Sequence, residues 1–224
     1  MRRALVLAAV VLAGCGSTSS APPTPPTSPT PTLRGAGSLG QRFGDLPQRG
    51  AALGSPRAPY TLVEFADLQC PFCAAFDRDV LPDVIDRYVR PGRLRIELRP
   101  IAFLGPQSAP AAAATVAAGL QNRMWQFADL FYRNQGRENS GYVTPRFLGR
   151  LARTAGLDLA RFNRASSTPR LVAILRANAQ AARTARITGT PGLRLGRTGG
   201  ALAPFSQGPI RRAQFLRRLA AELS

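Results

Sequence analysis

The strongest constraint on the fold is a short apolar segment that runs almost directly into a pair of cysteines at the start of a helix. Tyr60–Ala66 is rich in β-branched and aromatic residues, which is typical of a strand buried on both faces. The motif Cys70-Pro71-Phe72-Cys73 follows, and residues 76–89 then repeat apolar side chains at spacings of three and four. Leu94–Leu98 alternates apolar and charged residues. These segments predict a strand–helix–strand unit with parallel strands.

The rest of the chain completes an α/β domain over residues 57–224. Ser108–Arg186 reads as several helices in a row, because Thr144-Pro145 and Thr168-Pro169 each offer an N-cap followed by a proline in the first turn. Two short apolar runs around Gly199-Gly200 predict a hairpin, and a final amphipathic helix begins near residue 210. We therefore expect a helical insertion, at about 106–187, between a β-α-β half and a hairpin–helix half.

The ionisable residues exclude several kinds of site. With no histidine and three cysteines, the chain can form neither a Ser-His-Asp or Cys-His catalytic group nor a zinc site of four Cys and His ligands. The net charge is +18, and all 30 basic residues are arginine. The arginines are scattered rather than interleaved with aromatic residues, so we expect no nucleic-acid partner and attribute the charge mainly to compositional drift.

The N-terminus has the layout of an export signal. Arg2 and Arg3 precede a short apolar run, and Leu12-Ala13-Gly14-Cys15 resembles the lipobox of bacterial lipoproteins, in which the cysteine carries a diacylglycerol. This predicts a signal peptide over 1–14, a lipid anchor on Cys15 and a Pro/Ser/Thr/Gly-rich linker over 15–56. The protein would be extracytoplasmic and anchored to the membrane. An ordinary secretory signal with a chance cysteine, or a third redox thiol, is the alternative.

The cysteine pair indicates redox chemistry. Two cysteines three apart at a helix start lie on one face, so a disulfide can close and reopen with little backbone movement. Cys70 lies where unpaired backbone N–H groups favour the thiolate, which makes it the attacking nucleophile. Cys73, one turn further in, would be the shielded resolving thiol. The alternatives are an inert disulfide, which stabilises little across so short a loop, and half of a metal site.

Two acidic residues precede the pair. Glu64 lies among apolar neighbours on the predicted strand, so we expect a buried carboxyl with a raised pKa that could accept the proton of Cys73. A solvated Glu64 at a sheet edge is the alternative. Asp67 falls in the strand–helix loop, where we expect solvent exposure and a turn or capping role without catalysis.

Residues 63–73, together with Gly189-Thr190-Pro191, resemble the DsbA-like thiol–disulfide oxidoreductases of the thioredoxin superfamily. The resemblance spans roughly residues 57–224 and includes the helical insertion. It implies that Pro191 is cis and faces the cysteines, that Pro71, Phe72 and Thr190 line the active-site loop, and that the redox-active Cys70–Cys73 disulfide is used without a cofactor or metal. Phe72, where several members carry histidine, and Gly192 depart from the family pattern.

By this resemblance the expected function is thiol–disulfide exchange on exported, cysteine-containing proteins, as a disulfide-donating oxidase recycled by a membrane redox partner. We expect a monomer, because no dimerisation module is visible. A reductase or isomerase using the same cysteines is one alternative. A non-catalytic, envelope-binding lipoprotein that uses its arginine-rich surface is another.

Overall fold

The computed structural model describes residues 32–165 and 168–224, which form nine α-helices, two other short helices and six strands. The strands are β1 (Gln48–Arg49), β2 (Ala52–Leu53), β3 (Tyr60–Ala66), β4 (Leu94–Pro100), β5 (Gly192–Arg197) and β6 (Ala203–Gln207). The helices are η1 (Ala36–Ser38), α1 (Leu39–Phe43), α2 (Pro71–Asp79), α3 (Leu81–Val84), a π-helical turn η2 (Ile85–Val89), α4 (Ser108–Gly119), α5 (Met124–Arg133), α6 (Pro145–Thr154), α7 (Leu159–Ala165), α8 (Pro169–Thr184) and α9 (Arg212–Glu222).

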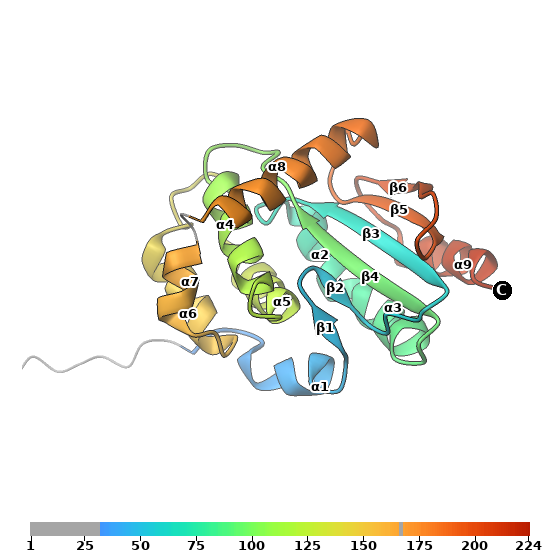
Figure 1. The fold of residues 1–224 in the computed structure, drawn as a ribbon, viewed down its shortest axis with the longest axis horizontal. Coiled ribbons are helices and arrows are strands. Elements are labelled where there is room, and N and C mark those ends of the chain that lie inside the picture. The colour runs from blue at the N-terminus through green and yellow to red at the C-terminus, as the bar shows by residue number, and fades with distance from the viewer. Residues whose placement is uncertain (1–31, 166–167) are drawn as a thin grey trace, which may run out of the picture. The chain divides into compact units, whose positions relative to one another are not determined.

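The strands form a single mixed sheet in the order β1-β2-β4-β3-β5-β6 (Figure 1). The central strand β3 is parallel to β4 and antiparallel to β5. Six of its seven residues are buried, so the prediction of a strand covered on both faces is confirmed. β5 and β6 form the predicted antiparallel hairpin. Because β3 lies in the middle, the segment that follows its carboxyl end is held by neighbours on both sides.

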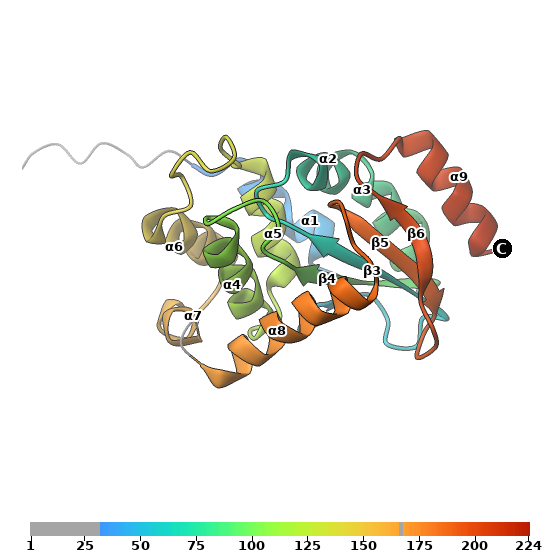
Figure 2. The ribbon, with the colours of Figure 1, turned by 90° about the horizontal axis from the view of Figure 1, so that it is seen from above.

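Helices lie on both faces of the sheet. Figure 2 shows α2, α3 and α9 on one face and α8 on the other. The predicted insertion is confirmed as α4 to α8, and Thr144 and Thr168 cap α6 and α8 by accepting hydrogen bonds from the backbone N–H groups of Phe147 and Leu171. The helix after the cysteines is interrupted at Val80, just before Pro82, where α2 gives way to α3 and η2.

The core confirms the expected aromatic cluster. Trp125, Phe127, Leu130 and Phe131 lie in α5, within the helical insertion, and are all at most 1% exposed. On the other side, the ring of Phe215 in α9 contacts Phe76 and Phe205 edge to face, with ring centroids 5.5 and 5.2 Å apart. Within the described residues, no helix is long and apolar enough to cross a bilayer.

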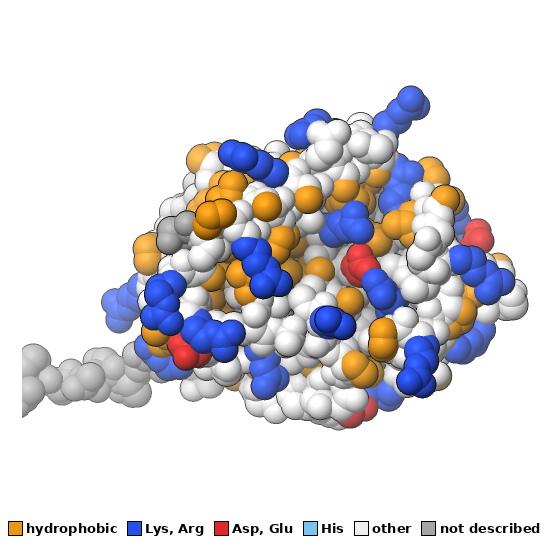
Figure 3. Space-filling view, viewed as in Figure 1, with side chains coloured by type: hydrophobic (Ala, Val, Ile, Leu, Met, Phe, Trp, Pro, Cys, Tyr) orange, Lys and Arg blue, Asp and Glu red, His pale blue; other side chains and the backbone are white. Residues whose placement is uncertain are grey.

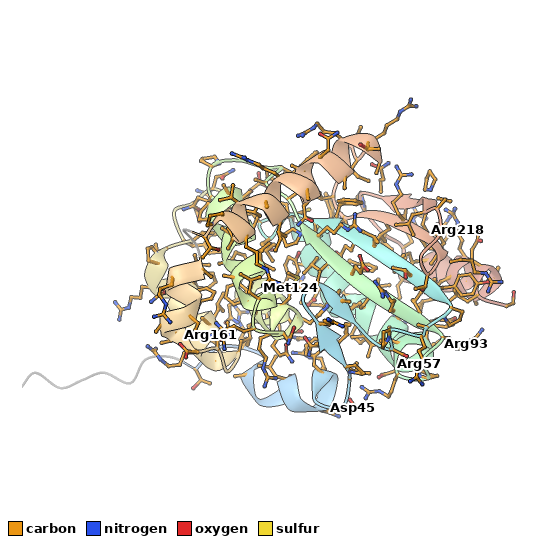
Figure 4. The ribbon with its side chains drawn as sticks, viewed as in Figure 1. Asp45, Arg57, Arg93, Met124, Arg161 and Arg218 are labelled. Atoms are coloured by element: carbon orange, nitrogen blue, oxygen red, sulfur yellow. The ribbon has the colours of Figure 1, made fainter. Side chains whose placement is uncertain are left out.

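The segment before residue 57 is more regular than predicted. The sequence predicts a linker whose residues 33–56 form a loose lead-in that packs partly on the domain. Its described part contains α1 and the β1–β2 pair, and β2 extends the sheet next to β4. Phe43 and Leu53 are 2% and 0% exposed. Asp45, labelled in Figure 4 after α1, forms an ion pair with Arg90. Two-residue strands and a five-residue helix are too short to show a periodicity, which is why the sequence did not reveal them. The predicted signal and Cys15 lie outside the described residues.

Candidate active site

The two cysteines lie at the start of α2, directly beyond the carboxyl end of β3. Cys70 is the N-cap residue of α2, with an extended backbone, and Pro71 is in the first turn. Cys70 is 3% exposed and Cys73 is fully buried, and both are free thiols. Pro71 and Phe72 between them are exposed, Phe72 by 49%. The apolar loop residues therefore point outward and the thiols inward.

The surroundings of Cys70 favour its thiolate. One contact favours the protonated form, since the thiol donates a hydrogen bond to the carbonyl oxygen of Thr190 at 3.4 Å. A hydrogen bond from the Cys73 side chain contributes most to lowering the Cys70 pKa, helped by the Thr190 side chain and the backbone N–H groups of Phe72 and Cys73. These outweigh desolvation and bring the pKa from 9.0 to about 6. At neutral pH Cys70 is therefore largely ionised.

Cys73 has the opposite character. Burial, its hydrogen bond to Cys70 and the nearby charge of Glu64 raise the pKa of this thiol well above 9.0. The two thiols differ because only Cys70 lies at the helix end, where backbone N–H groups are free. The geometry thus pairs an ionised, outer sulfur with a protonated, inner one.

Glu64 lies beneath the pair on β3, and the expected buried carboxyl is observed. It is 5% exposed, and its Oε1 atom is buried without a hydrogen-bond partner among the described residues. Desolvation, with a smaller contribution from the charge of Cys70, raises its pKa from 4.5 to about 8. Glu64 is therefore mostly neutral at pH 7 and can give up or accept a proton in the physiological range.

A second group of buried polar residues continues away from the thiols and was missed at the sequence level. Asp77, one turn after Cys73 in α2, is 6% exposed, and burial together with the charge of Asp129 raises its pKa well above 3.8. Asp129 in α5 pairs with Arg42 and Arg133, yet burial still raises its pKa to about 7. The sequence signal was present for Asp77, since Cys73, Ala74, Val80 and Leu81 surround it on an apolar helix face.

Asp67 is not exposed, which corrects the sequence-based expectation. It is fully buried, and its carboxylate accepts three backbone hydrogen bonds, from Gln69, Phe103 and Leu104, at 2.9, 2.7 and 2.9 Å. The expected turn role is present, but the carboxylate also joins the loop before the cysteines to the loop after β4. Phe103 and Leu104 lie more than thirty residues after Asp67, so no local pattern could reveal their hydrogen bonds to it.

The helical insertion holds the same loop from the other side. Gln135 donates from Nε2 to the carbonyl oxygens of Leu68 and Cys70, at 2.8 and 3.2 Å. Gln69, which is 1% exposed, donates to Ser108 and Asn139 and accepts from the Asn139 backbone N–H. Every residue from 67 to 70 is thereby tied to another part of the chain.

The loop opposite the cysteines contains a cis Thr190-Pro191 bond, as the family resemblance implied. Thr190 is 4% exposed, and its backbone N–H has no hydrogen-bond partner among the described residues. The carbonyl of Pro191 accepts from Gly208 at 2.9 Å. A Cβ on Gly192 would lie 2.8 Å from Ile187 Cγ2, so glycine is required there by close packing. No cluster of three or more potential metal ligands occurs within the described residues.

A sequence profile described as thioredoxin matches residues 48–199, about two thirds of the chain. The chain belongs to the thioredoxin family. Within this family it is 34% identical, over 95 residues, to the probable disulfide bond formation protein D of Bacillus cereus. The match covers 42% of the chain and 44% of that relative, so the chain spans about half the length of the curated protein.

Solved structures show the same fold. The crystal structure of oxidised BdbD from Bacillus subtilis aligns with a TM-score of 0.65 and 20% identity, covering 80% of this chain and 95% of the other. A thioredoxin-like oxidoreductase from Silicibacter pomeroyi DSS-3 aligns with a TM-score of 0.62 and 25% identity, covering 82% and 96%. The insertion and the cysteine-bearing helix are thus part of a DsbA-like architecture.

Proposed function

We propose that this protein is a thiol–disulfide oxidase that donates the Cys70–Cys73 disulfide to other proteins. The observation that carries the proposal is the opposite pKa shift of the two thiols, to about 6 for Cys70 and well above 9.0 for Cys73. Stabilising the Cys70 thiolate stabilises the reduced form, so the disulfide is readily given away. The names of the relatives, which refer to disulfide bond formation, support the same direction.

The exchange has two steps. A substrate thiolate attacks Cys70 Sγ in the disulfide, forming a mixed disulfide with Cys70 and releasing Cys73 as the leaving thiolate. A second substrate thiolate then attacks the substrate sulfur of the mixed disulfide. The substrate leaves with a new disulfide and Cys70 leaves as a thiolate, so two electrons have passed to the protein. The low pKa of Cys70 makes it a good leaving group in the second step.

Glu64 manages the proton of Cys73 in this scheme. The released Cys73 thiolate is buried, where a negative charge is costly, and a neutral Glu64 beneath it supplies the proton that removes this charge. In the reverse direction, when the pair is reoxidised, the Glu64 carboxylate accepts the proton as Cys73 attacks. Its pKa of about 8 suits both roles.

Substrates would bind as extended chains beside the cis-proline loop. The free N–H of Thr190 offers one backbone donor next to Cys70, and backbone pairing selects no particular side chain. The exposed ring of Phe72 adds apolar contact. We propose exported cysteine-containing proteins as substrates, a membrane redox partner that restores the disulfide, a monomeric protein and an extracytoplasmic location with a lipid on Cys15.

The first experiment is a redox titration of the purified full chain in glutathione buffers. Trypsin releases peptide 58–78, which holds both active-site cysteines and not Cys15, so alkylation mass shifts on it report this pair alone. We expect a midpoint toward about −120 mV, typical of a strong oxidase. A midpoint near about −270 mV would instead identify a reductase. The absence of any reversible transition would overturn redox function altogether.

Trapping distinguishes the roles of the thiols. Cys73→Ser removes the resolver and should accumulate mixed disulfides between Cys70 and substrates, visible on non-reducing gels. Cys70→Ser is the matched control and should trap none. Equal trapping by both variants would contradict the assignment of Cys70 as the reacting sulfur.

The anchor is tested separately. With the full chain expressed in a bacterial host, Cys15→Ser should move the protein from the membrane fraction to the soluble extracytoplasmic fraction and abolish incorporation of labelled fatty acid. The exchange activity of the folded domain does not depend on this residue. Unchanged fractionation of the variant would contradict lipid anchoring.

A further inference from the structure

A cavity of about 550 Å³ lies between α8 and the face of the sheet opposite to α2. Its walls come from β3, β4 and β5 on one side and from the second half of α8 on the other, with Phe65, Arg99 and Arg194 contributed by the strands. Figure 1 shows α8 crossing this face of the sheet. The volume is that of a site for a small organic molecule.

Arg194 is the unusual residue in this cavity. It is only 9% exposed, and its Nε atom is buried without a partner. No hydrogen bond or ion pair joins Arg194 to another described residue. A guanidinium group keeps its positive charge at every physiological pH, so it cannot relieve its burial by losing a proton. A side chain that is nine-tenths buried, carries a fixed charge and has no ion-pair partner favours an anion in the cavity that it lines.

The neighbouring charges leave Arg194 without a counterion. Glu97 on β4 and Arg194 on β5 flank Val63 on the same face of the sheet. The Glu97 carboxylate, however, is engaged by Arg95 and by Arg99, the latter at 3.2 Å. The Glu97 carboxylate thus pairs with two arginines, and Arg194 is left without a carboxylate partner. In Figure 3, which views this face, blue side chains lie on both sides of a red one over the sheet.

The remaining walls define the body of the ligand. Arg99 is held over the ring of Phe65, with its guanidinium carbon 5.7 Å from the ring centroid, so a second cation faces the same space. Phe65, Ala181 and Leu202 supply apolar surface, and Gln180 and Thr184 are the neutral polar residues. We propose that this cavity binds a carboxylate or phosphate carried on a small apolar body, with Arg194 as its bidentate partner and Arg99 as the second cation.

The site is separate from the redox centre. Arg194 lies three residues after Pro191 on β5, which corresponds to about 10 Å along the strand. A ligand on Arg194 therefore leaves the Thr190 backbone open to substrates. The same oxyanion chemistry is available from soluble metabolites and from the headgroups of anionic lipids, and the experiment distinguishes them.

Binding is measured by calorimetric titration of the full chain with hexyl phosphate. Hexanol retains only the apolar chain of this probe and inorganic phosphate only its oxyanion, so each should bind much more weakly. Arg194→Gln should weaken hexyl phosphate binding by about 30-fold or more, the effect of removing one partner of a buried ion pair. Arg170→Gln, which removes an exposed arginine from α8 outside the cavity, is the matched control and should bind as the wild type does.

Vesicle flotation identifies the source. Arg194-dependent binding to phosphatidylglycerol vesicles, and not to phosphatidylcholine vesicles, would assign the ligand to lipid. Arg194-dependent binding to soluble hexyl phosphate alone would assign it to free metabolites. Both outcomes support an oxyanion site, whereas equal binding by wild type, Arg194→Gln and Arg170→Gln to every probe would overturn it.

Thermal unfolding separates a ligand site from a structural role and shows whether the variants fold. Without ligand, Arg194→Met should raise Tm, because it replaces a buried unpaired charge by an apolar side chain of similar length. Hexyl phosphate should raise the Tm of the wild type and leave that of Arg194→Met unchanged. A lower Tm for Arg194→Met, with equal stabilisation of both proteins by hexyl phosphate, would show that Arg194 is structural and overturn the proposal.

Discussion

The two faces of the central sheet bury charge in opposite ways. On the side of α2, strand β3 presents Leu62 and Glu64, and the carboxyl group stays buried with a pKa of about 8. On the side of α8, the same strand presents Val63 and Phe65, and its neighbours there are Arg194 and the Arg95–Glu97–Arg99 group. One strand thus separates a face with buried acids from a face whose buried charged group is the guanidinium of Arg194.

The difference shows what each kind of group requires. A buried carboxyl group can take up a proton and become neutral, so Glu64 and Asp77 persist without an ion pair. A guanidinium group has no such option and needs an anion. The first situation yields a proton donor and acceptor for chemistry. The second yields a binding site.

Two substitutions on adjacent residues of β3 should differ most strongly in their effect on the free energy of unfolding. Leu62→Asp places a carboxylate in the apolar core and should destabilise the fold by about 4 kcal/mol or more, enough to prevent folding. Val63→Asp lies opposite Arg194 and gains a buried ion pair, so it should remain folded, with a loss of roughly 1–2 kcal/mol. Urea denaturation measures both. Equal losses of unfolding free energy in the two variants would mean that the α2 and α8 faces of the sheet do not differ in charge.

A substitution of Asp67 tests the hydrogen bonds that hold the loop between β3 and the cysteines. Asp67→Ala leaves three backbone N–H groups without their acceptor, at a cost of roughly 2–4 kcal/mol in the free energy of unfolding. Asp79→Ala, at an exposed position in α2, is the matched control and should change stability by less than about 0.5 kcal/mol. Urea denaturation again provides the measurement. Similar losses of unfolding free energy in both variants would contradict a stabilising role of the three hydrogen bonds to Asp67.

The pH dependence of stability should report the burial of the Glu64 carboxyl group on the α2 face. The folded-state pKa of Glu64 lies above its unfolded value, so this group contributes stability that is complete below about pH 4.5 and lost as pH rises to about 8. Glu64→Gln should therefore flatten the fall of Tm between pH 5 and 8, by the equivalent of about 1–3 kcal/mol. Glu222→Gln, at an exposed site, is the control. An unchanged slope in Glu64→Gln would show that the carboxyl is solvated.

The smallest effect concerns packing at the start of β5. In Gly192→Ala the new Cβ would press on Ile187, which must move, at a cost of about 1–2 kcal/mol. Gly149→Ala in α6 meets nothing within 4 Å and should stabilise the protein by up to about 1 kcal/mol. Thermal unfolding of both variants provides the check. A stabilising Gly192→Ala would show that the loop is looser than the structure indicates.

The sequence predicted those parts of the fold that depend on local patterns. The bounds of β3 match because a strand buried on both faces is a continuous apolar run. The caps of α6 and α8 match because Thr-Pro acts within one turn. The burial of Glu64 followed from its neighbours. The chemical roles of Cys70, Cys73 and Glu64 remain predictions for the experiments above.

What the sequence missed depends on distant contacts. The acceptor role of Asp67 requires the loop after β4. The hydrogen bonds from Gln135 to the cysteine loop require the insertion to fold back on the cysteines. Arg194 alternates with leucines in a run that reads as an ordinary hairpin strand, and only the sheet register and α8 bury it. In each case tertiary packing gives an ordinary polar residue its importance.

The contacts of Cys70 also determine when the redox centre can form during synthesis of the chain. A ribosome delivers a chain from its N-terminus, so the cysteine motif emerges long before Gln135 and Thr190, which lie 65 and 120 residues later. Until Gln135 and Thr190 are synthesised, the loop before the cysteines lacks the hydrogen bonds from Gln135, and Cys70 Sγ lacks its contact with the Thr190 carbonyl oxygen. The reactive centre is therefore assembled last although its cysteines are made early, and an unfinished chain carries ordinary thiols rather than a completed redox centre.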